Sequence, residues 1–237
     1  MKKVLTLFTL LIFAAALNAQ ILVDENFDYA VGDSLTGHGW LVTGTNALGT
    51  ILVEPGNLSY PGYPLSDIGN HVSITGGLSR QDVNIPYTSQ TSGSVYNSFL
   101  LNVTAATTTG DYFFNVGPNP IASSFRARVF VKDDGTGKLL FGFAQSSSNV
   151  TYTTTTYEYN TTYLFVVEYK FVPATTSDDT VKLYINPTLD GPAPAANITY
   201  VSATPGADLL QIGAAAIRQG SQAYSIKLDG LRVTTGW

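Results

Sequence analysis

The sequence predicts an all-β protein, a two-sheet antiparallel β-sandwich of the jelly-roll type. Short runs rich in β-branched and aromatic residues alternate apolar and polar side chains with period two, and turns containing Gly or Pro separate them. After the first 19 residues, no segment has the apolar spacing of a helix. Without helices to cover a parallel sheet, such strands form a sandwich or a barrel, and a length of 237 residues favours the larger sandwich.

The N-terminus has the three-part layout of a secretory signal peptide over residues 1–19. Two lysines precede an apolar run at 4–16, and cleavage is expected after Ala19. The run is shorter than the roughly 20 residues that span a membrane. We therefore expect a single jelly-roll domain over 20–237, secreted into the medium or held at the cell surface, with no membrane insertion after signal cleavage.

The middle of the mature chain predicts a hairpin. In 125–132, apolar residues at the odd positions alternate with Arg126, Arg128 and Lys132. A turn at 133–137 follows, and the apolar face resumes directly after it. Later turns at the same kind of spacing predict a meander. Further strands are predicted at 21–27, 71–74, 99–103, 111–116, 150–158, 163–171, 181–186 and 209–214.

The last strand changes parity in its middle. Ile226 and Leu228 share one face of a regular strand, whereas Leu231 and Val233 share the other. The pair Asp229-Gly230 stands at the change. A β-bulge there would return all four apolar side chains to one face.

Three stretches carry a resemblance to a known superfamily. They are Glu25-Asn26-Phe27-Asp28-Tyr29 with Gly39-Trp40 after it, the strand at 163–169 followed by Val181-Lys182-Leu183-Tyr184-Ile185-Asn186, and the closing Leu228-Asp229-Gly230-Leu231-Arg232-Val233. On these residues the chain resembles the concanavalin A-like lectin/glucanase superfamily, in particular the laminin G-like jelly rolls of secreted Bacteroidota-type proteins. The resemblance implies that the first and last strands lie side by side. It leaves function open, since this fold carries lectins, hydrolases and adhesive modules alike.

Charge and composition exclude several partners and sites. A net charge of -5 and a pI near 4.8 give no basic patch, so nucleic acid is not an expected partner. The absence of cysteine excludes disulfides, thiolate metal sites and a lipoprotein signal. Charged residues make up 12% of the chain, about half of the roughly 25% usual in soluble domains, so the surface must be polar but mostly uncharged.

Motifs for hydrolysis are incomplete. The block 32–35, Gly-Asp-Ser-Leu, matches the nucleophile motif of one esterase class, but no apolar strand precedes it and no Asp-x-x-His follows, so we interpret it as a polar turn. Laminarinase-like enzymes set three carboxylates along one strand, whereas Glu158 and Glu168 lie on separate predicted strands. A cross-strand pair about 5 Å apart is the remaining catalytic alternative. His38 and His71 are expected to make ordinary hydrogen bonds rather than to bind zinc.

An aromatic loop predicts a glycan-binding surface. A sugar presents an apolar C–H face and a rim of hydroxyls, which an aromatic ring beside amides and carboxylates complements. The candidate ligand-binding residues are Tyr60, Tyr63, Asp67, Asn70, Trp40 and Tyr184. The alternative is that the two loop tyrosines pack over a sheet edge and the tryptophan fills the core.

Calcium is the ion that the acidic residues favour. Asp24, Asp28 and Asp229 offer hard oxygen ligands near the paired ends of the chain, and the bulge would aim the last of them. The same Asp229 would also serve as a plain turn former. We expect no required cofactor and treat a structural calcium as a candidate.

The sequence thus predicts a secreted, non-catalytic, lectin-like domain that binds a polysaccharide or cell-surface glycan, or serves as an accessory module. The first alternative is a structural or adhesive cell-surface module without a small ligand. A glycoside hydrolase on the same fold is a minor alternative.

Overall fold

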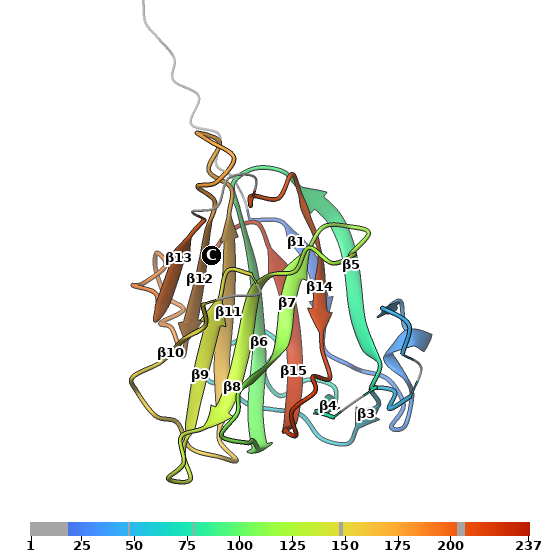
Figure 1. The fold of residues 1–237 in the computed structure, drawn as a ribbon. Helices are drawn as coiled ribbons and strands as arrows, with labels where there is room; N and C mark the ends of the chain where they lie inside the picture. The colour runs from blue at the N-terminus through green and yellow to red at the C-terminus, as the bar shows by residue number, and fades with distance from the viewer. Residues whose placement is uncertain (1–18, 47, 78, 147–148, 203–206) are drawn as a thin grey trace, which may run out of the picture.

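Two antiparallel β-sheets face each other in the computed structural model, which describes residues 19–46, 48–77, 79–146, 149–202 and 207–237 (Figure 1). The predicted fold class is confirmed. Within the described residues the only helical element is a single turn of 3-10 helix, η1 (Leu35–Gly37), and no helix is long and apolar enough to cross a membrane. Apart from Ala19, the predicted signal peptide lies outside the described residues, so it stays a prediction.

The eight-stranded sheet joins the two ends of the chain. Its strands, in spatial order, are β13 (Ile198–Val201), β12 (Thr180–Ile185), β11 (Thr162–Lys170), β6 (Ser94–Ala105), β15 (Ser225–Thr234), β4 (His71–Thr75) and β3 (Val53–Glu54), with β1 (Ile21–Glu25) also paired to β15. The first half of β15 pairs with β4 and the second half with β1. The predicted pairing of the first and last strands is therefore confirmed.

The bulge predicted in the last strand is also confirmed. The register between β15 and β6 shifts between Asp229 and Arg232, and Gly230 adopts a positive φ of 56°. Leu228 and Leu231, on either side of the shift, are both fully buried in the core. The extra residue restores one apolar face, as the change of parity requires.

The seven-stranded sheet forms the other layer. Its strands, in spatial order, are β10 (Thr151–Tyr152), β9 (Leu139–Ala144), β8 (Arg126–Asp133), β7 (Asp111–Gly117), β14 (Ile212–Ile217), β5 (Asp82–Gln90) and β2 (Leu41–Thr43). The predicted hairpin is β8 and β9, which pair over six residues of each strand. Ala127, Val129 and Val131 face the core, so the basic residues that alternate with them lie on the outer face.

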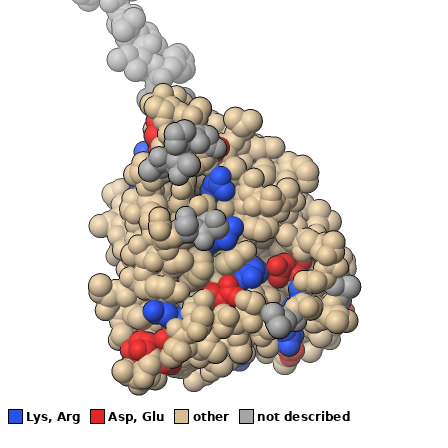
Figure 2. All heavy atoms as spheres, in the orientation of Figure 1, with Lys and Arg blue, Asp and Glu red and all other residues tan. Residues whose placement is uncertain are grey.

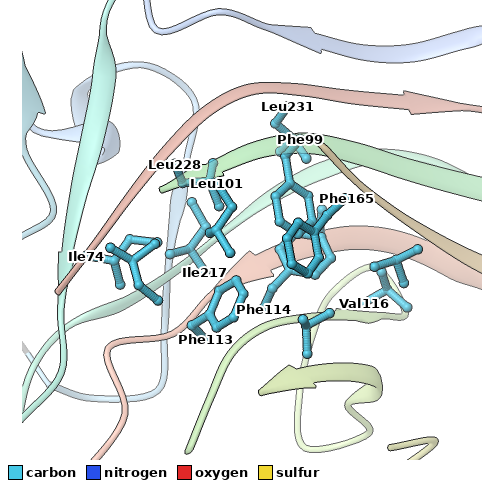
Figure 3. Close-up of a cluster of buried hydrophobic side chains, with 14 of the residues drawn as sticks. Ile74, Phe99, Leu101, Phe113, Phe114, Val116, Phe165, Ile217, Leu228 and Leu231 are labelled. Carbon is cyan, nitrogen blue, oxygen red and sulfur yellow. The ribbon is translucent and has the colours of Figure 1, made fainter. Parts of the chain in front are cut away.

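Aromatic rings fill the space between the sheets (Figure 3). The ring of Phe99 on β6 lies 4.6 Å from that of Phe114 on β7 and 5.7 Å from that of Phe165 on β11, centroid to centroid. All three are fully buried. Contacts of this kind lock the two sheets together and so fix which residues each sheet presents outward.

Two predictions about the middle strands were wrong. The strand expected at 150–158 is reduced to the two residues of β10, and β11 does not continue a meander but crosses to the eight-stranded sheet, between β6 and β12. The reason is the composition of β11, in which seven consecutive residues are buried. A strand that is apolar on both faces needs cover on both, which a position in the middle of a sheet with loops packed on its outer side provides.

Candidate functional site

The outer face of the seven-stranded sheet gathers several of the chain's cations. Arg126, Arg128 and Lys132 project outward from β8, and Arg218 follows directly after β14. Figure 2 shows this face, where separate basic side chains, some with acidic ones beside them, lie among mainly uncharged residues. In an acidic protein, such a local group of cations is an electrostatic site for anions.

Tyr112 on β7 lies under two of these cations. The guanidinium carbon of Arg218 is 4.0 Å from the centroid of the tyrosine ring, and that of Arg128 is 4.7 Å from it. The Phe130 ring, opposite Tyr112 in the register, lies 5.5 Å away. Cation–π contact with both arginines holds the phenol beside two positive charges.

Arg218 is fixed by carboxylates. Its Nη1 donates to Asp111 Oδ1 at 2.6 Å, and its Nε lies 4.0 Å from Asp82 Oδ2. Burial opposes ionisation of Asp111, but the Arg218 charge and several hydrogen bonds outweigh it and hold the pKa of this carboxyl below its usual range. The Arg218 charge is therefore compensated within the protein.

Arg128 has no such compensation. It forms no ion pair with a carboxylate of any described residue, and its Nε is buried without a hydrogen-bond partner. Burial lowers the pKa of its guanidinium, and the neighbouring charges of Arg218 and Arg126 lower it further, against the opposing effect of Tyr112. A partly buried cation without a counter-charge is costly, and a bound anion would remove that cost.

A β-bulge brings an amide beside this arginine. Between the paired positions Phe114–Val129 and Val116–Arg126, β7 contributes only Asn115 whereas β8 contributes two residues, one of them Arg128. Asn115 is only 2% exposed, and its Nδ2 has no hydrogen-bond partner. Bulges often re-aim side chains next to active sites.

A small residue lies beside Asn115, and the Arg126 side chain is anchored. Ala216 stands opposite Asn115 in the register between β14 and β7. Arg126, by contrast, is tied to the protein, because its Nε and Nη2 donate to the Ala207 carbonyl at 3.1 and 2.7 Å. Arg128 Nε and Asn115 Nδ2 are thus buried donors of this face without a partner among the described residues, and the Tyr112 ring lies beside Arg128.

The predicted aromatic platform is not an exposed surface. Trp40 is 1% exposed and donates from Nε1 to Glu25, which places it in the core. Tyr63 and Tyr184 are also buried, and their hydroxyls donate to the Gly230 carbonyl and to Glu168. The ligand-binding role predicted for these three residues is corrected, and Trp40 instead fills the core, as the alternative stated above has it.

The polar residues of the predicted glycan-binding set, Asp67 and Asn70, form hydrogen bonds within and next to their own loop. Asp67 accepts hydrogen bonds from the Ser59 and Ser66 hydroxyls. Asn70 donates to the Tyr29 carbonyl and accepts from the Gly56 N–H. Tyr60 is partly exposed at the same loop. These contacts stabilise the connection between β3 and β4 and leave no shared ligand site with Trp40.

The predicted calcium ligands do not meet. Both oxygens of the fully buried Asp229 accept backbone N–H groups, from Leu58 and Gly230, while Asp24 lies 3.6 Å from Arg232. Asp28 is exposed. The only described trio of acidic ligand atoms within 4.8 Å of one another is Asp178, Asp179 and Asp208.

The esterase-like block is a turn, as predicted. Asp33 Oδ2 lies 2.9 Å from His38 Nε2, but the Ser34 hydroxyl is hydrogen-bonded to Thr36. His71 is bonded through Nδ1 to the Gly56 carbonyl. No histidine therefore activates the serine.

The two predicted candidate carboxylates have separate partners. Exposed Glu158 pairs with Lys138 at 2.5 Å, whereas buried Glu168 lies 3.1 Å from Lys182. Burial works against ionisation of Glu168, but hydrogen bonds from Ser94, Lys182 and Tyr184 lower the pKa of this carboxyl overall. Glu168 is thus held as an anion by its neighbours and serves as a structural anchor.

Comparison with known proteins finds similarity in structure alone. No family model matches the chain, and no curated protein sequence matches it. The alginate lyase Aly36B has a TM-score of 0.59 at 13% identity, over 89% of this chain and 95% of that one. A carbohydrate esterase from the Shiga toxin-encoding bacteriophage phi24B has a TM-score of 0.55 at 13% identity, over 93% and 100%. An endo-β-1,4-glucuronan lyase from the fungus Trichoderma reesei has a TM-score of 0.52 at 11% identity, over 86% of this chain and 93% of that one.

These matches confirm the sandwich and its likeness to carbohydrate-active folds, and they correct one prediction. The sequence was expected to encode a non-catalytic protein because the motifs of glycosidases and esterases are incomplete. Lyases share this fold, and a variant of the alginate lyase that was solved with a tetrasaccharide has a lysine and a tyrosine replaced by alanine. The sequence analysis did not consider lysine and tyrosine as catalytic residues. The absence of complete glycosidase and esterase motifs therefore does not exclude an enzyme. The bacterial group and secretion stay predictions.

Proposed function

We infer that the protein is a polysaccharide-cleaving enzyme that binds an acidic polysaccharide across the outer face of the seven-stranded sheet. The observation that carries this proposal is Arg128, a partly buried guanidinium without a carboxylate partner. Asn115 adds an unpaired N–H donor next to it. Together they form a site for one carboxylate, which a uronic acid residue carries.

Elimination is the cleavage chemistry that fits these groups. A base takes the proton from C5 of the uronic acid, next to the carboxylate. The electron pair forms a C4–C5 double bond, the bond from C4 to the glycosidic oxygen breaks, and that oxygen leaves with a proton. Negative charge grows on the carboxylate during this step, so cations and N–H donors around it lower the barrier.

The residues of the face match the requirements of that step. Arg128 and Asn115 would bind and neutralise the carboxylate. Tyr112, as its phenolate, would take the C5 proton, and the hydroxyl formed in this way would give the proton to the leaving glycosidic oxygen. Arg218, held by Asp111, adds a fixed positive charge over the same ring. Alginate and glucuronan are both polymers of uronic acids, and lyases named for them share this fold. That likeness supports the reaction class without choosing the polymer.

The test is a direct assay for the elimination product. Purified protein is incubated with alginate, with glucuronan and with a neutral cello-oligosaccharide, and the ultraviolet absorbance of the new double bond is followed. We expect a rise with at least one acidic polymer and none with the neutral one. Arg128→Ala should abolish the rise, whereas Lys170→Ala, an exposed cation on the eight-stranded sheet, should leave it unchanged. Folded protein that gives no product from either acidic polymer would refute the proposal.

A further inference from the structure

A cavity lies on the opposite side of the sandwich from Arg128. Its volume is about 430 Å³, within the roughly 300–1,000 Å³ typical of small-molecule sites. Its floor is the outer face of the eight-stranded sheet at β1, β15, β6 and β11. Loop residues 62–64 and 189–190 and residues 236–237 form its walls. Because walls enclose the cavity on several sides, it suits the end of a polymeric ligand better than the middle of one.

Two hydrogen-bond donors of this cavity have no acceptor. The indole Nε1 of Trp237 is buried without a partner. The Nε of Arg232 is also buried and unpartnered, and the nearest carboxylate oxygen, on Asp24, is 3.6 Å away. Both residues line the cavity. Buried donors are normally satisfied, and oxygen atoms of a bound ligand could serve as acceptors for both.

The aromatic wall is fixed from behind. Trp237 packs edge-on against Tyr96 and Tyr184, with ring centroids 5.8 and 5.0 Å apart. The hydroxyls of both tyrosines donate to Glu168, at 3.3 and 2.9 Å, and Lys182 pairs with the same carboxylate. This buried anchor holds the rings in place before any ligand arrives, which lowers the cost of binding.

The rim supplies an acceptor. Asp190 lines the cavity from an exposed loop position, and its carboxylate forms no ion pair or hydrogen bond with a described residue. The cavity therefore combines unpaired N–H donors, a free carboxylate and an aromatic ring. A sugar has the complementary set, with ether and hydroxyl oxygens that accept, hydroxyls that donate, and an apolar C–H face.

We propose that this cavity is a second saccharide site, which holds the end of a short glycan between Trp237, Arg232 and Asp190. It lies on the other sheet from Arg128 and would bind without cleaving. The proposal goes beyond the cleavage proposed above and does not require it, since each site is built from different residues and each can be removed separately.

Tryptophan fluorescence reports on this cavity directly. Of the two tryptophans, Trp40 is buried in the core, so a ligand-dependent change must come from Trp237. The probes are alginate trisaccharide and cellotriose, titrated into the purified protein with calorimetry in parallel. We expect a saturable change of fluorescence with at least one probe, and heat of binding at the same concentrations.

Variants assign the signal to the cavity. Asp190→Asn is exposed and should fold normally, and we expect about tenfold weaker binding because one hydrogen bond to a charged group is lost. Trp237→Phe keeps a ring but removes the donor, and its calorimetric affinity should fall by a similar factor. Asp28→Asn, an exposed acid elsewhere, should bind both probes as the wild type does. Arg128→Ala should leave the Trp237 fluorescence titration and the heat of cellotriose binding unchanged, because it alters only the face of the other sheet. The proposal is overturned if neither probe changes the fluorescence, or if Arg128→Ala abolishes the change while Asp190→Asn preserves it.

Discussion

Asp111 fixes the position of Arg218 through a hydrogen bond of 2.6 Å from Nη1 to Oδ1. The other carboxylate oxygen of Asp111 accepts the backbone N–H groups of Ser221 and Gln222, so a single side chain joins β7 to the turn after β14. The guanidinium is thereby held over the Tyr112 ring. One arginine of the face is thus part of the scaffold, whereas Arg128 has no carboxylate partner among the described residues.

Replacing Asp111 by Asn should weaken both the scaffold and the site. The Arg218 charge would lose its partner, at a cost of about 2–3 kcal/mol, since the pair is partly exposed. The pKa of Asp111 is held below its usual range, so the stability from this pair is present above the ordinary carboxyl pKa and is lost as the pH falls. Urea unfolding across the acidic range should therefore show a smaller loss on acidification in the variant than in the wild type. Equal losses would contradict this role.

Arg128→Gln should separate binding from stability. We expect affinity for an acidic oligosaccharide to fall about 10- to 100-fold, because a charge-assisted hydrogen bond to the carboxylate is lost. The free energy of unfolding should stay within about 1 kcal/mol of the wild type, or rise, since no internal ion pair is broken. Calorimetric titration and thermal unfolding measure the two effects, with Lys170→Gln as the control. A large loss of stability would identify Arg128 as a structural residue instead.

The sequence alone could predict which side chains share a face of one strand. It could not predict which strands lie beside that strand in the sheet. The alternation in β8 correctly assigned Arg126, Arg128 and Lys132 to one side. Tyr112 and Arg218 are about a hundred residues apart in the chain, and only the order β8-β7-β14 brings them together. No local signal marks that contact, so the site was missed.

Two other errors have equally specific causes. The nine-residue β5 was not predicted, and Pro86 stands in its middle, where a proline usually ends a strand. Pro86 pairs with Ala214 beside a shift of register, which accommodates it. Trp40 was a candidate for a ligand surface with the core as the alternative, and Glu25 accepts its indole N–H inside the core. Burial of a polar aromatic group depends on a distant partner, and the sequence does not reveal it.

Two glycines with positive φ form a matched pair for testing close packing. Gly69 has a φ of 68°, and a Cβ there would lie 2.0 Å from the Asn26 carbonyl oxygen. Gly135 has a φ of 86°, and a Cβ added there would have no heavy atom within 4 Å. Gly135→Ala should cost about 1–2 kcal/mol from backbone strain alone. Gly69→Ala should cost about 3 kcal/mol or more, because the loop must also move away from the backbone that follows β1. Similar melting temperatures for the two variants would show that the backbone at Gly69 can move away from the Asn26 carbonyl at little cost.

Asp229 should make the protein less stable as the pH rises toward neutrality. Burial raises the pKa of its carboxyl to about 7, although hydrogen bonds from the Leu58 and Gly230 N–H groups oppose the shift. Above the ordinary value of 3.8, the unfolded chain loses this proton while the folded chain keeps it. The stability contributed by the protonated group is therefore complete below about pH 4 and declines until about pH 7, by about 4 kcal/mol at most. Asp229→Asn removes the titration, so its unfolding free energy should vary less over this interval than that of the wild type or of the exposed control Asp190→Asn. If all three proteins show the same dependence on pH, the buried carboxyl is already ionised under acidic conditions, and the two backbone N–H groups must outweigh its burial.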